Sequence, residues 1–325
     1  MGRLLLLGCA ILLPALLAGA AQATPAPPGG QWITLGTMGG PVANPRRSQP
    51  ANVLLVPEGA ILVDAGDGTA EQLAKAQIPL PQLRAVILSH LHWDHTGGLA
   101  ALLGLRFQTN VPGALRIYGP PGTRALVAGL IASMQPGAEA GYGDPHAAAV
   151  HPADTVEVTE LADASTTTIA QGVVLRTVQN THFSFPPGSD LDRRYKSFAY
   201  RFDMRAHSIV YTGDTGPSTA VEQLAQGADL LVSEMIDLDG TLATVKRNTP
   251  EMDARALAGL TWHLTHHHLT PEQVGQLAGR AKVKRVVVTH ITPGDTSPAD
   301  RGRFLAAIRR NYNGPADLAE DLEVY

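Results

Sequence analysis

Cysteine is almost absent from this chain of 325 residues, because Cys9 is the only one. A single cysteine cannot form an intramolecular disulfide or a cluster of thiolate metal ligands. Any metal site must therefore be built from histidine, aspartate, glutamate and water. An excess of positive charge is absent too, since the formal net charge is -4. A chain without a basic field does not attract nucleic acid in general, so we expect no nucleic-acid partner.

A membrane-spanning run is also lacking. The apolar run at residues 4–17 is shorter than the roughly 20 residues that a bilayer needs and is interrupted by Pro14. It follows a short positive start and precedes Ala21-Gln22-Ala23, a small-x-small cleavage site. This layout predicts a signal peptide over residues 1–23, followed by a Pro/Gly linker at residues 24–30. The alternative of a lipoprotein modified at Cys9 is disfavoured because the apolar run before it is too short. We expect an exported protein, periplasmic or secreted, with no membrane attachment after cleavage.

No internal repeat at a solenoid period is visible, and the 24 prolines and 33 glycines favour tight connections between short elements. Strand-like runs are interspersed with helix-like runs and hairpin signals, a pattern typical of an α/β protein with mixed sheets. We expect a single domain at residues 31–325. Strands are predicted at 32–35, 52–56, 60–64, 85–88, 116–118, 155–159, 173–178, 198–202, 208–211, 230–232 and 285–288. Helices are predicted at 69–78, 123–134 and from 270 and 297, with loops at 135–154 and 183–194.

One short stretch carries the strongest chemical signal. Residues 89–95 read Ser-His-Leu-His-Trp-Asp-His, which places three histidines and one aspartate within six residues, directly after the buried strand expected at 85–88. Imidazole nitrogens and carboxylate oxygens bind zinc and similar ions at about 2.0–2.2 Å. Three imidazoles so close together are costly unless something binds them. The stretch therefore predicts a metal site that includes His90, His92, Asp94 and His95.

Polar residues end other strand-like runs as well, at Asp64, His182, Asp214 and His290. Strand ends at one edge of a sheet can converge on one site. Taken alone, His182 is more often a structural histidine and Asp214 more often a turn residue. Two-metal hydrolases place their ions about 3.5–4 Å apart and activate a bridging water. The candidate ligands for such a site are His90, His92, Asp94, His95, His182, Asp214 and His290.

The pattern His90-x-His92-x-Asp94-His95 resembles the signature of the metallo-β-lactamase superfamily. Asp64, His182, Asp214 and His290 fall in order at its other motif positions, and the resemblance covers nearly the whole mature chain. It implies an αββα four-layer sandwich with two mixed sheets flanked by helices. It also implies two divalent ions, zinc first and manganese or iron as alternatives, because the ligand types suit all three. The implied ligands are His90, His92 and His182 for one ion and Asp94, His95 and His290 for the other, with Asp214 bridging and Asp64 steadying the ligands from outside.

Further motifs narrow the resemblance to the ribonuclease Z and arylsulfatase-like branch. They are the Gly-rich turn at residues 35–41, the stretch at 118–123, and His268-Leu269-Thr270-Pro271. In that branch an extra histidine before a helix assists the leaving group or contacts an anionic ester oxygen, and the start of a helix favours an anion. The resemblance assigns this role to His268. The Gly-rich turn is either a plain turn or a loop beside the metals, and the roles of His266 and His267 stay open.

We expect a dinuclear metal-dependent hydrolase in which a metal-bridged hydroxide attacks a small anionic sulfate or phosphate (di)ester. Asp214, Asp94 and His268 are the expected catalytic residues. The branch's ribonuclease Z carries a basic arm for transfer RNA that we do not find here, which favours the small substrate. The alternatives are a β-lactamase or lactonase on the same site, and a non-catalytic metal-binding or ligand-binding protein. The loop at 183–196 is either a substrate wall or a surface flap, and a homodimer stays open.

Overall fold

The computed structural model describes residues 30–143, 151–294 and 296–325. The predicted signal peptide at residues 1–23 and most of the predicted linker lie outside these ranges, so both stay predictions. In the part of the chain that is described, no helix is long and apolar enough to cross a membrane.

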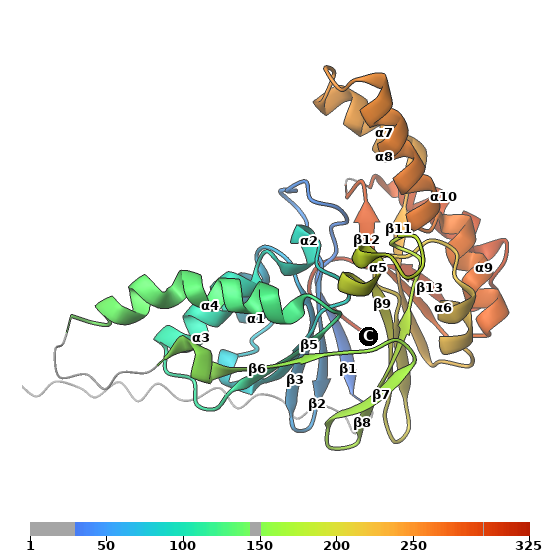
Figure 1. The fold of residues 1–325 in the computed structure, drawn as a ribbon. Coiled ribbons are helices and arrows are strands. Elements are labelled where there is room, and N and C mark those ends of the chain that lie inside the picture. The colour runs from blue at the N-terminus through green and yellow to red at the C-terminus, as the bar shows by residue number, and fades with distance from the viewer. Residues whose placement is uncertain (1–29, 144–150, 295) are drawn as a thin grey trace, which may run out of the picture.

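Two mixed β-sheets lie face to face (Figure 1). The first runs in the order β14 (Glu323–Val324), β1 (Gln31–Gly36), β2 (Ala51–Val56), β3 (Gly59–Ala65), β4 (Leu83–Ile87), β5 (Leu115–Gly119) and β6 (Val156–Glu160). The second runs β13 (Ala316–Leu318), β12 (Val286–Thr292), β11 (Leu230–Ile236), β10 (Ser208–Tyr211), β9 (Phe198–Asp203), β8 (Val173–Gln179) and β7 (Ser165–Ala170). In each sheet an antiparallel half joins a parallel half at β3 or β10.

The strands are apolar on both faces, and the two faces bury different cores. Trp32 and Leu54 point between the sheets, where the Trp32 ring lies 5.8 Å from that of Phe202 in the second sheet. Their neighbours Ile33 and Val53 point to the outer face of the first sheet. Side chains alternate along a strand, so a sheet covered on both sides reads as a continuous apolar run.

Helices cover both outer faces. The first sheet is covered by α1 (Thr69–Lys75), α3 (Leu99–Gln108) and α4 (Thr123–Ala140), and the second by α6 (Thr219–Leu224), α9 (Pro271–Ala281) and α10 (Pro298–Arg309). The predicted capping box opens α9, since the Thr270 hydroxyl accepts from the Gln273 amide and the Gln273 side chain accepts from the Thr270 amide. The predicted αββα sandwich is confirmed.

Several elements differ from the prediction. The chain between β11 and α9 forms two helices, α7 (Leu238–Asn248) and α8 (Ala254–His267), which project together from the body of the molecule (Figure 1). We call them the arm. Helix α4 continues through Pro136, where a proline predicts an end. Strand β7 was missed because this edge strand is rich in polar threonine. The shorter helices are α2 (Trp93–Thr96), α5 (Asp190–Arg194), η1 (Leu80–Gln82) and η2 (Pro152–Thr155).

Candidate metal centre

The strand ends that carry the predicted ligands meet at one edge of the two sheets. Strands β3 and β4 run parallel in the first sheet, and β8, β10 and β12 point the same way in the second, so their carboxyl ends share an edge. The candidate side chains form two groups in which one ligand atom of each residue lies within 4.8 Å of all the others. The groups are His90, His92 and His182, and Asp94, His95, Asp214 and His290.

The first group consists of three imidazoles whose nitrogens converge. His92 Nδ1 lies 3.0 Å from His90 Nε2 and 3.1 Å from His182 Nε2. His90 and His182 are buried, whereas His92 is exposed and lines a cavity. Three nitrogens at these separations can all face one point, as the ligands of a single ion do.

Hydrogen bonds on the far side of the rings fix which nitrogen carries the proton. His182 Nδ1 lies 3.2 Å from the carbonyl of His267, which can only accept, so the proton sits on Nδ1. The Ser89 hydroxyl donates to Asp64 at 2.8 Å and therefore accepts from His90 Nδ1 at 3.1 Å. Both rings consequently present Nε2 as a lone pair to the site, the arrangement typical of metal-binding histidines.

The second group centres on Asp214. Its Oδ1 lies 3.3 Å from His95 Nε2, and its Oδ2 lies 3.2 Å from His290 Nε2. Asp94 Oδ2 lies 3.5 Å from the same two histidine nitrogens. Asp214 Oδ2 is also 3.9 Å from the Nε2 atoms of His90 and His182. Asp214 therefore stands between the two groups.

Asp64 lies beneath the site and holds it together. This fully buried carboxylate accepts hydrogen bonds from the Ser89 amide at 2.7 Å, the Ser89 hydroxyl at 2.8 Å and the Tyr211 hydroxyl at 2.7 Å. His95 Nδ1 donates to it at 2.8 Å. Asp64 has a φ of 60° and His290 one of 45°, left-handed values that non-glycine residues rarely adopt and that often mark functional sites.

His268 lies beside the second group, and a carboxylate that we did not predict holds it. His268 Nδ1 is 3.1 Å from Glu234 Oε2, and both side chains are buried. Glu234 Oε1 also accepts from the amides of Leu269 and Thr215 at 3.1 and 3.0 Å. The only sequence signal for Glu234 is its place at the end of a strand-like run. His268 Nε2 is left for the adjoining cavity.

Charge and burial divide the histidines of the site into two kinds. Burial, with neighbouring histidines, holds the pKa of His90 and of His182 well below the ordinary value, so both are neutral. Burial also disfavours charge on His95 and His290, but the neighbouring carboxylates, Asp214 and Asp94 among them, together outweigh it. The pKa of His95 is well above its usual range and that of His290 is raised to about 10. Burial likewise raises the pKa of Asp214, yet His290 and His95 bring it well below its usual range.

The residues present fit divalent cations. The described residues give His95 Nε2, Asp214 Oδ1 and His290 Nδ1 no hydrogen-bond partner, although all three atoms are buried. Buried polar atoms without partners are costly, and the buried carboxylates also call for positive charge. The neutral imidazoles of His90 and His182 and the carboxylate oxygens of Asp94 and Asp214 supply both ligand types that such ions take.

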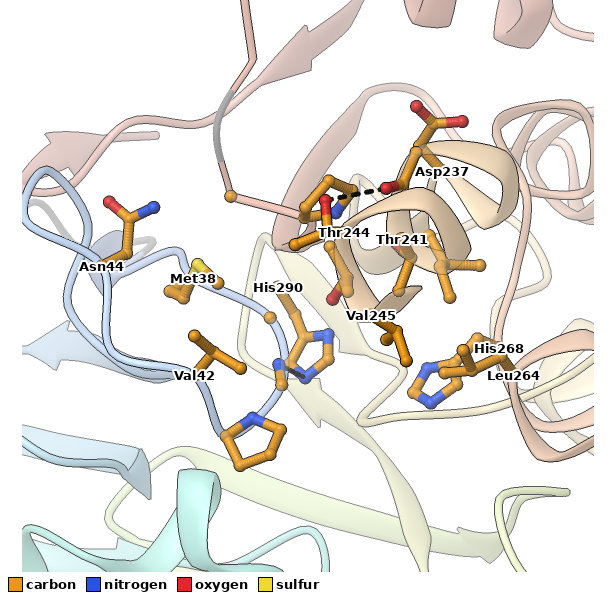
Figure 2. Close-up of a pocket in the computed structure, with 18 of the residues that line it drawn as sticks. Met38, Val42, Asn44, Asp237, Thr241, Thr244, Val245, Leu264, His268 and His290 are labelled. Atoms are coloured by element: carbon orange, nitrogen blue, oxygen red, sulfur yellow. Dashed lines mark hydrogen bonds between the residues drawn. The ribbon is translucent and has the colours of Figure 1, made fainter. Parts of the chain in front are cut away.

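The site opens into a cavity of about 1220 Å³. Figure 2 shows Met38, Val42 and Asn44 on one side, in the loop at residues 37–50 between β1 and β2, which contains the Gly-rich turn and which we call the Gly-rich loop. Thr241, Val245 and Leu264 of the arm lie on the other side. His290 lies between these walls, and His268 lies beside Leu264 on the side of the arm. The chain between β11 and His268, which sequence patterns left without helices, thus forms one wall of the cavity.

The Gly-rich turn is a loop beside the site. The Gly39 backbone lies so close to His290 that an added Cβ would be 2.8 Å from His290 Nδ1. The buried Arg47 anchors the loop by donating to the Thr37 hydroxyl at 2.6 Å and the Gly294 carbonyl at 3.0 Å. Glycine is needed at residue 39 because it lets the backbone approach a ligand closely.

The undecided histidines differ from each other. His266 is exposed and its Nδ1 bonds the Trp262 carbonyl at 2.7 Å. His267 is buried, and besides holding His182 through its carbonyl it lies 2.8 Å from His263 Nδ1 and 2.6 Å from the Ser184 hydroxyl. His263, which we did not predict, faces the cavity; burial, with His268 and His267, lowers its pKa to about 4.

The loop at 183–196 meets the site through one aromatic ring. The Phe183 ring lies 5.3 Å from that of His92 and 5.2 Å from that of His182. Its basic residues pair within the loop, since Arg194 contacts Asp190 and Lys196 contacts Asp192. The start of the loop is thus a wall of the site, and its cations are held by its own carboxylates.

Comparison with known proteins gives consistent matches. The model of the beta-lactamase superfamily domain matches residues 60–291. A Mycobacterium avium protein named ribonuclease Z is 29% identical over 294 residues, which is 89% of this chain and 96% of that relative. Among solved structures, the metallo-beta-lactamase fold protein YhfI from Bacillus subtilis matches with a TM-score of 0.63 and 19% identity, over 91% of this chain and 99% of that one. Human tRNase Z, short form, matches with a TM-score of 0.61 and 23% identity, over 91% and 98%. The predicted family resemblance is confirmed.

The predicted substrate is wrong. The relatives are named for RNA, which overturns the small sulfate or phosphate ester and also its alternatives, a β-lactamase or lactonase and a non-catalytic binding protein. The prediction of no nucleic-acid partner is wrong for the same reason. Both relied on the net charge of -4 and on the lack of a basic arm. Charge summed over a chain does not describe one local site, where bound cations can supply the attraction for a phosphate.

Proposed function

This chain belongs to the beta-lactamase superfamily and is a metal-dependent hydrolase, and from that premise we propose that it hydrolyses a phosphodiester bond in RNA. The observation that carries the proposal is the match to relatives named ribonuclease Z over 89% of this chain and 96% of theirs. A match along nearly the whole of both chains includes the arm and the Gly-rich loop, and therefore the walls of the cavity as well as its floor.

We propose that both groups of side chains hold metal, and that the metal is zinc. His90, His92 and His182 would hold one ion, Asp94, His95 and His290 the other, and Asp214, which stands between the groups, would contact both. Such ions lower the pKa of a bound water and neutralise charge on a phosphoryl group. His90 and His182 contribute neutral lone pairs, which the bonds to Ser89 and the His267 carbonyl orient.

His268 is our proposed proton donor to the leaving oxygen. Glu234 accepts from its Nδ1, which fixes the ring and leaves Nε2 for the substrate side. Asp94 and Asp214 would orient the attacking water through their carboxylate oxygens. The arm and the Gly-rich loop would restrict the access of bulk water around the reacting phosphate.

A cleavage assay tests the function. Purified protein with added zinc or manganese should cleave a 5′-labelled single-stranded RNA, and a chelator should stop the reaction until metal is restored. The matched control is a DNA strand of the same sequence. Intact RNA after incubation with protein that carries a full metal complement would contradict the proposal.

We predict that His268→Ala lowers activity most on poor leaving groups. General acids contribute roughly 10²–10⁴-fold, and a p-nitrophenolate leaving group needs no proton, whereas a ribose oxygen does. The rate on RNA should therefore fall by at least roughly 10²-fold, with a smaller loss on uridine 5′-(p-nitrophenyl phosphate). His266→Ala is the control, since His266 is exposed and bonds only the Trp262 carbonyl. Equal losses on both substrates would exclude the acid role.

Export stays a prediction, because residues 1–23 lie outside the described ranges. We propose that the protein is periplasmic or secreted, which the apolar run at residues 4–17 and the Ala21-Gln22-Ala23 site support. Mass spectrometry of the N-terminus from cell fractions tests it, and an uncleaved Met1 in the cytoplasmic fraction would refute it.

A further inference from the structure

Trp93 is a large apolar side chain that is exposed at the metal centre. In the sequence, Trp93 lies between the candidate ligands His92 and Asp94. Its side chain is 75% exposed and lines the cavity. Among the described residues, Val42 is another large apolar side chain that is both exposed, at 58%, and part of the cavity lining. Exposed apolar surface gathered at a concave site marks a place where a ligand covers it.

The cavity walls continue this apolar surface. Val42 and Met38 face Val245 and Leu264 across the cavity, with His290 between them (Figure 2). The cavity therefore has two chemically different parts, a polar floor made of the metal ligands and an apolar rim. A phosphate suits the floor, and the rim suits an uncharged, flat group attached to it.

The two arginines that line the cavity, Arg303 and Arg247, have partners within the walls. Arg303 bonds Asp237 at 2.8 Å and Asp300 at 3.4 Å, and Arg247 donates to the Thr244 hydroxyl at 2.9 Å. These guanidinium groups are held by protein atoms. Affinity at the rim is thus expected to come from apolar and aromatic contact.

We propose that the rim is a nucleobase subsite in which the base next to the scissile phosphate stacks on the Trp93 indole, with Val42 completing the apolar rim. The proposal rests on the proposed RNA function and specifies how that substrate is held. Trp93 adjoins two candidate ligands in the sequence, so a ring stacked on it belongs to the nucleotide whose phosphate reaches the floor. Stacking tolerates every base, because each base has a π face.

A double-mutant cycle tests the contact. Removing the base that flanks the cleavage site, by an abasic substitution in the RNA, should lower kcat/KM of the natural protein by roughly 5- to 150-fold, the effect of one lost stack. Trp93→Leu should cause a similar loss on intact RNA and little further loss on the abasic strand. Trp93→Phe, which keeps a ring, should retain most of the activity. Losses that multiply fully would overturn the proposal.

Controls separate stacking from damage to the fold. Trp262→Leu is the matched control, because Trp262 is 50% exposed on the arm, packs on His266 at 4.6 Å and does not line the cavity. It should leave the dependence on the base unchanged. The metal content of each variant shows whether the floor is intact. If Trp93→Leu loses metal, quenching of Trp93 fluorescence in the natural protein by a bound nucleotide decides the question.

A binding measurement distinguishes failure of the subsite from failure of the proposed function. Uridine monophosphate added to the zinc-loaded protein should quench tryptophan fluorescence, and Trp93→Phe should remove that quenching although Trp32 and Trp262 remain. Quenching by Trp93 without RNA cleavage would reject the RNA hydrolase and keep a nucleotide subsite. RNA cleavage with no quenching and an additive cycle would reject the subsite and keep the hydrolase.

Discussion

Asp214→Ala is expected to abolish hydrolysis, by at least roughly 10³-fold, while the protein stays folded. Asp214 lies 3.2 Å from His290 and 3.3 Å from His95 and is the carboxylate between both groups of ligands. Its removal takes a ligand from each proposed ion at once. The side chain follows β10 and pairs with the histidines of the site, so the sheets do not depend on it. RNA cleavage rates and metal content by mass spectrometry measure the effect, and circular dichroism verifies the fold.

Asp67→Ala is the control for the loss of an aspartate near the site. Asp67 is exposed, follows the same strand end as Asp64, and lies outside both ligand groups. It should keep full activity and two ions per chain. An Asp214→Ala protein that retains a tenth of the natural rate would rule out the shared role of this carboxylate.

The sequence predicted which side chains come together at the candidate metal centre better than it predicted their hydrogen-bond partners and the walls of the cavity. Residues 90–95 are recognisable because the candidate ligands lie next to each other in the chain. Four other residues are recognisable because each ends a strand-like run, namely Asp64, His182, Asp214 and His290. The direction of β8, β10 and β12 brings those ends to one edge. A local pattern sufficed because strands that run in the same direction end at the same edge of a sheet. A residue at the end of one such strand therefore lies near the residues at the ends of the others.

The partners of those ligands could not be found in this way. Tyr211 reads as an ordinary apolar strand residue, and its bond to Asp64 spans 147 positions between the two sheets. Glu234 can be recognised as part of the site only once the turn after α8 has brought His268 to it. The arm was missed because the half-exposed helices α7 and α8 project from the body and bury few residues. The substrate was mistaken because net charge is a property of the whole chain, whereas recognition is local.

Asp64→Ala is the substitution with the largest expected effect on stability. It leaves the Ser89 amide and hydroxyl, the Tyr211 hydroxyl and His95 Nδ1 without their acceptor in a fully buried place. Removing one partner from a buried charged network costs about 3–5 kcal/mol. Alanine also tolerates the φ of 60° less well than aspartate. Urea unfolding of the metal-free protein should show the loss, and zinc affinity should fall by roughly 10- to 100-fold because His95 is no longer oriented.

Two further variants separate the contributions of Asp64. Tyr211→Phe removes a single bond, so it should cost about 1.5–3 kcal/mol, the range for a hydrogen bond to a charged group, with a smaller effect on zinc. Asp64→Asn keeps the shape and tolerates the left-handed backbone, so its stability should lie between those of the natural protein and Asp64→Ala. If Asp64→Asn were as unstable as Asp64→Ala, the negative charge would be the dominant contribution. An Asp64→Ala protein within 1 kcal/mol of the natural one (about one ordinary hydrogen bond) would show that water replaces the carboxylate, and the network would then not hold the site.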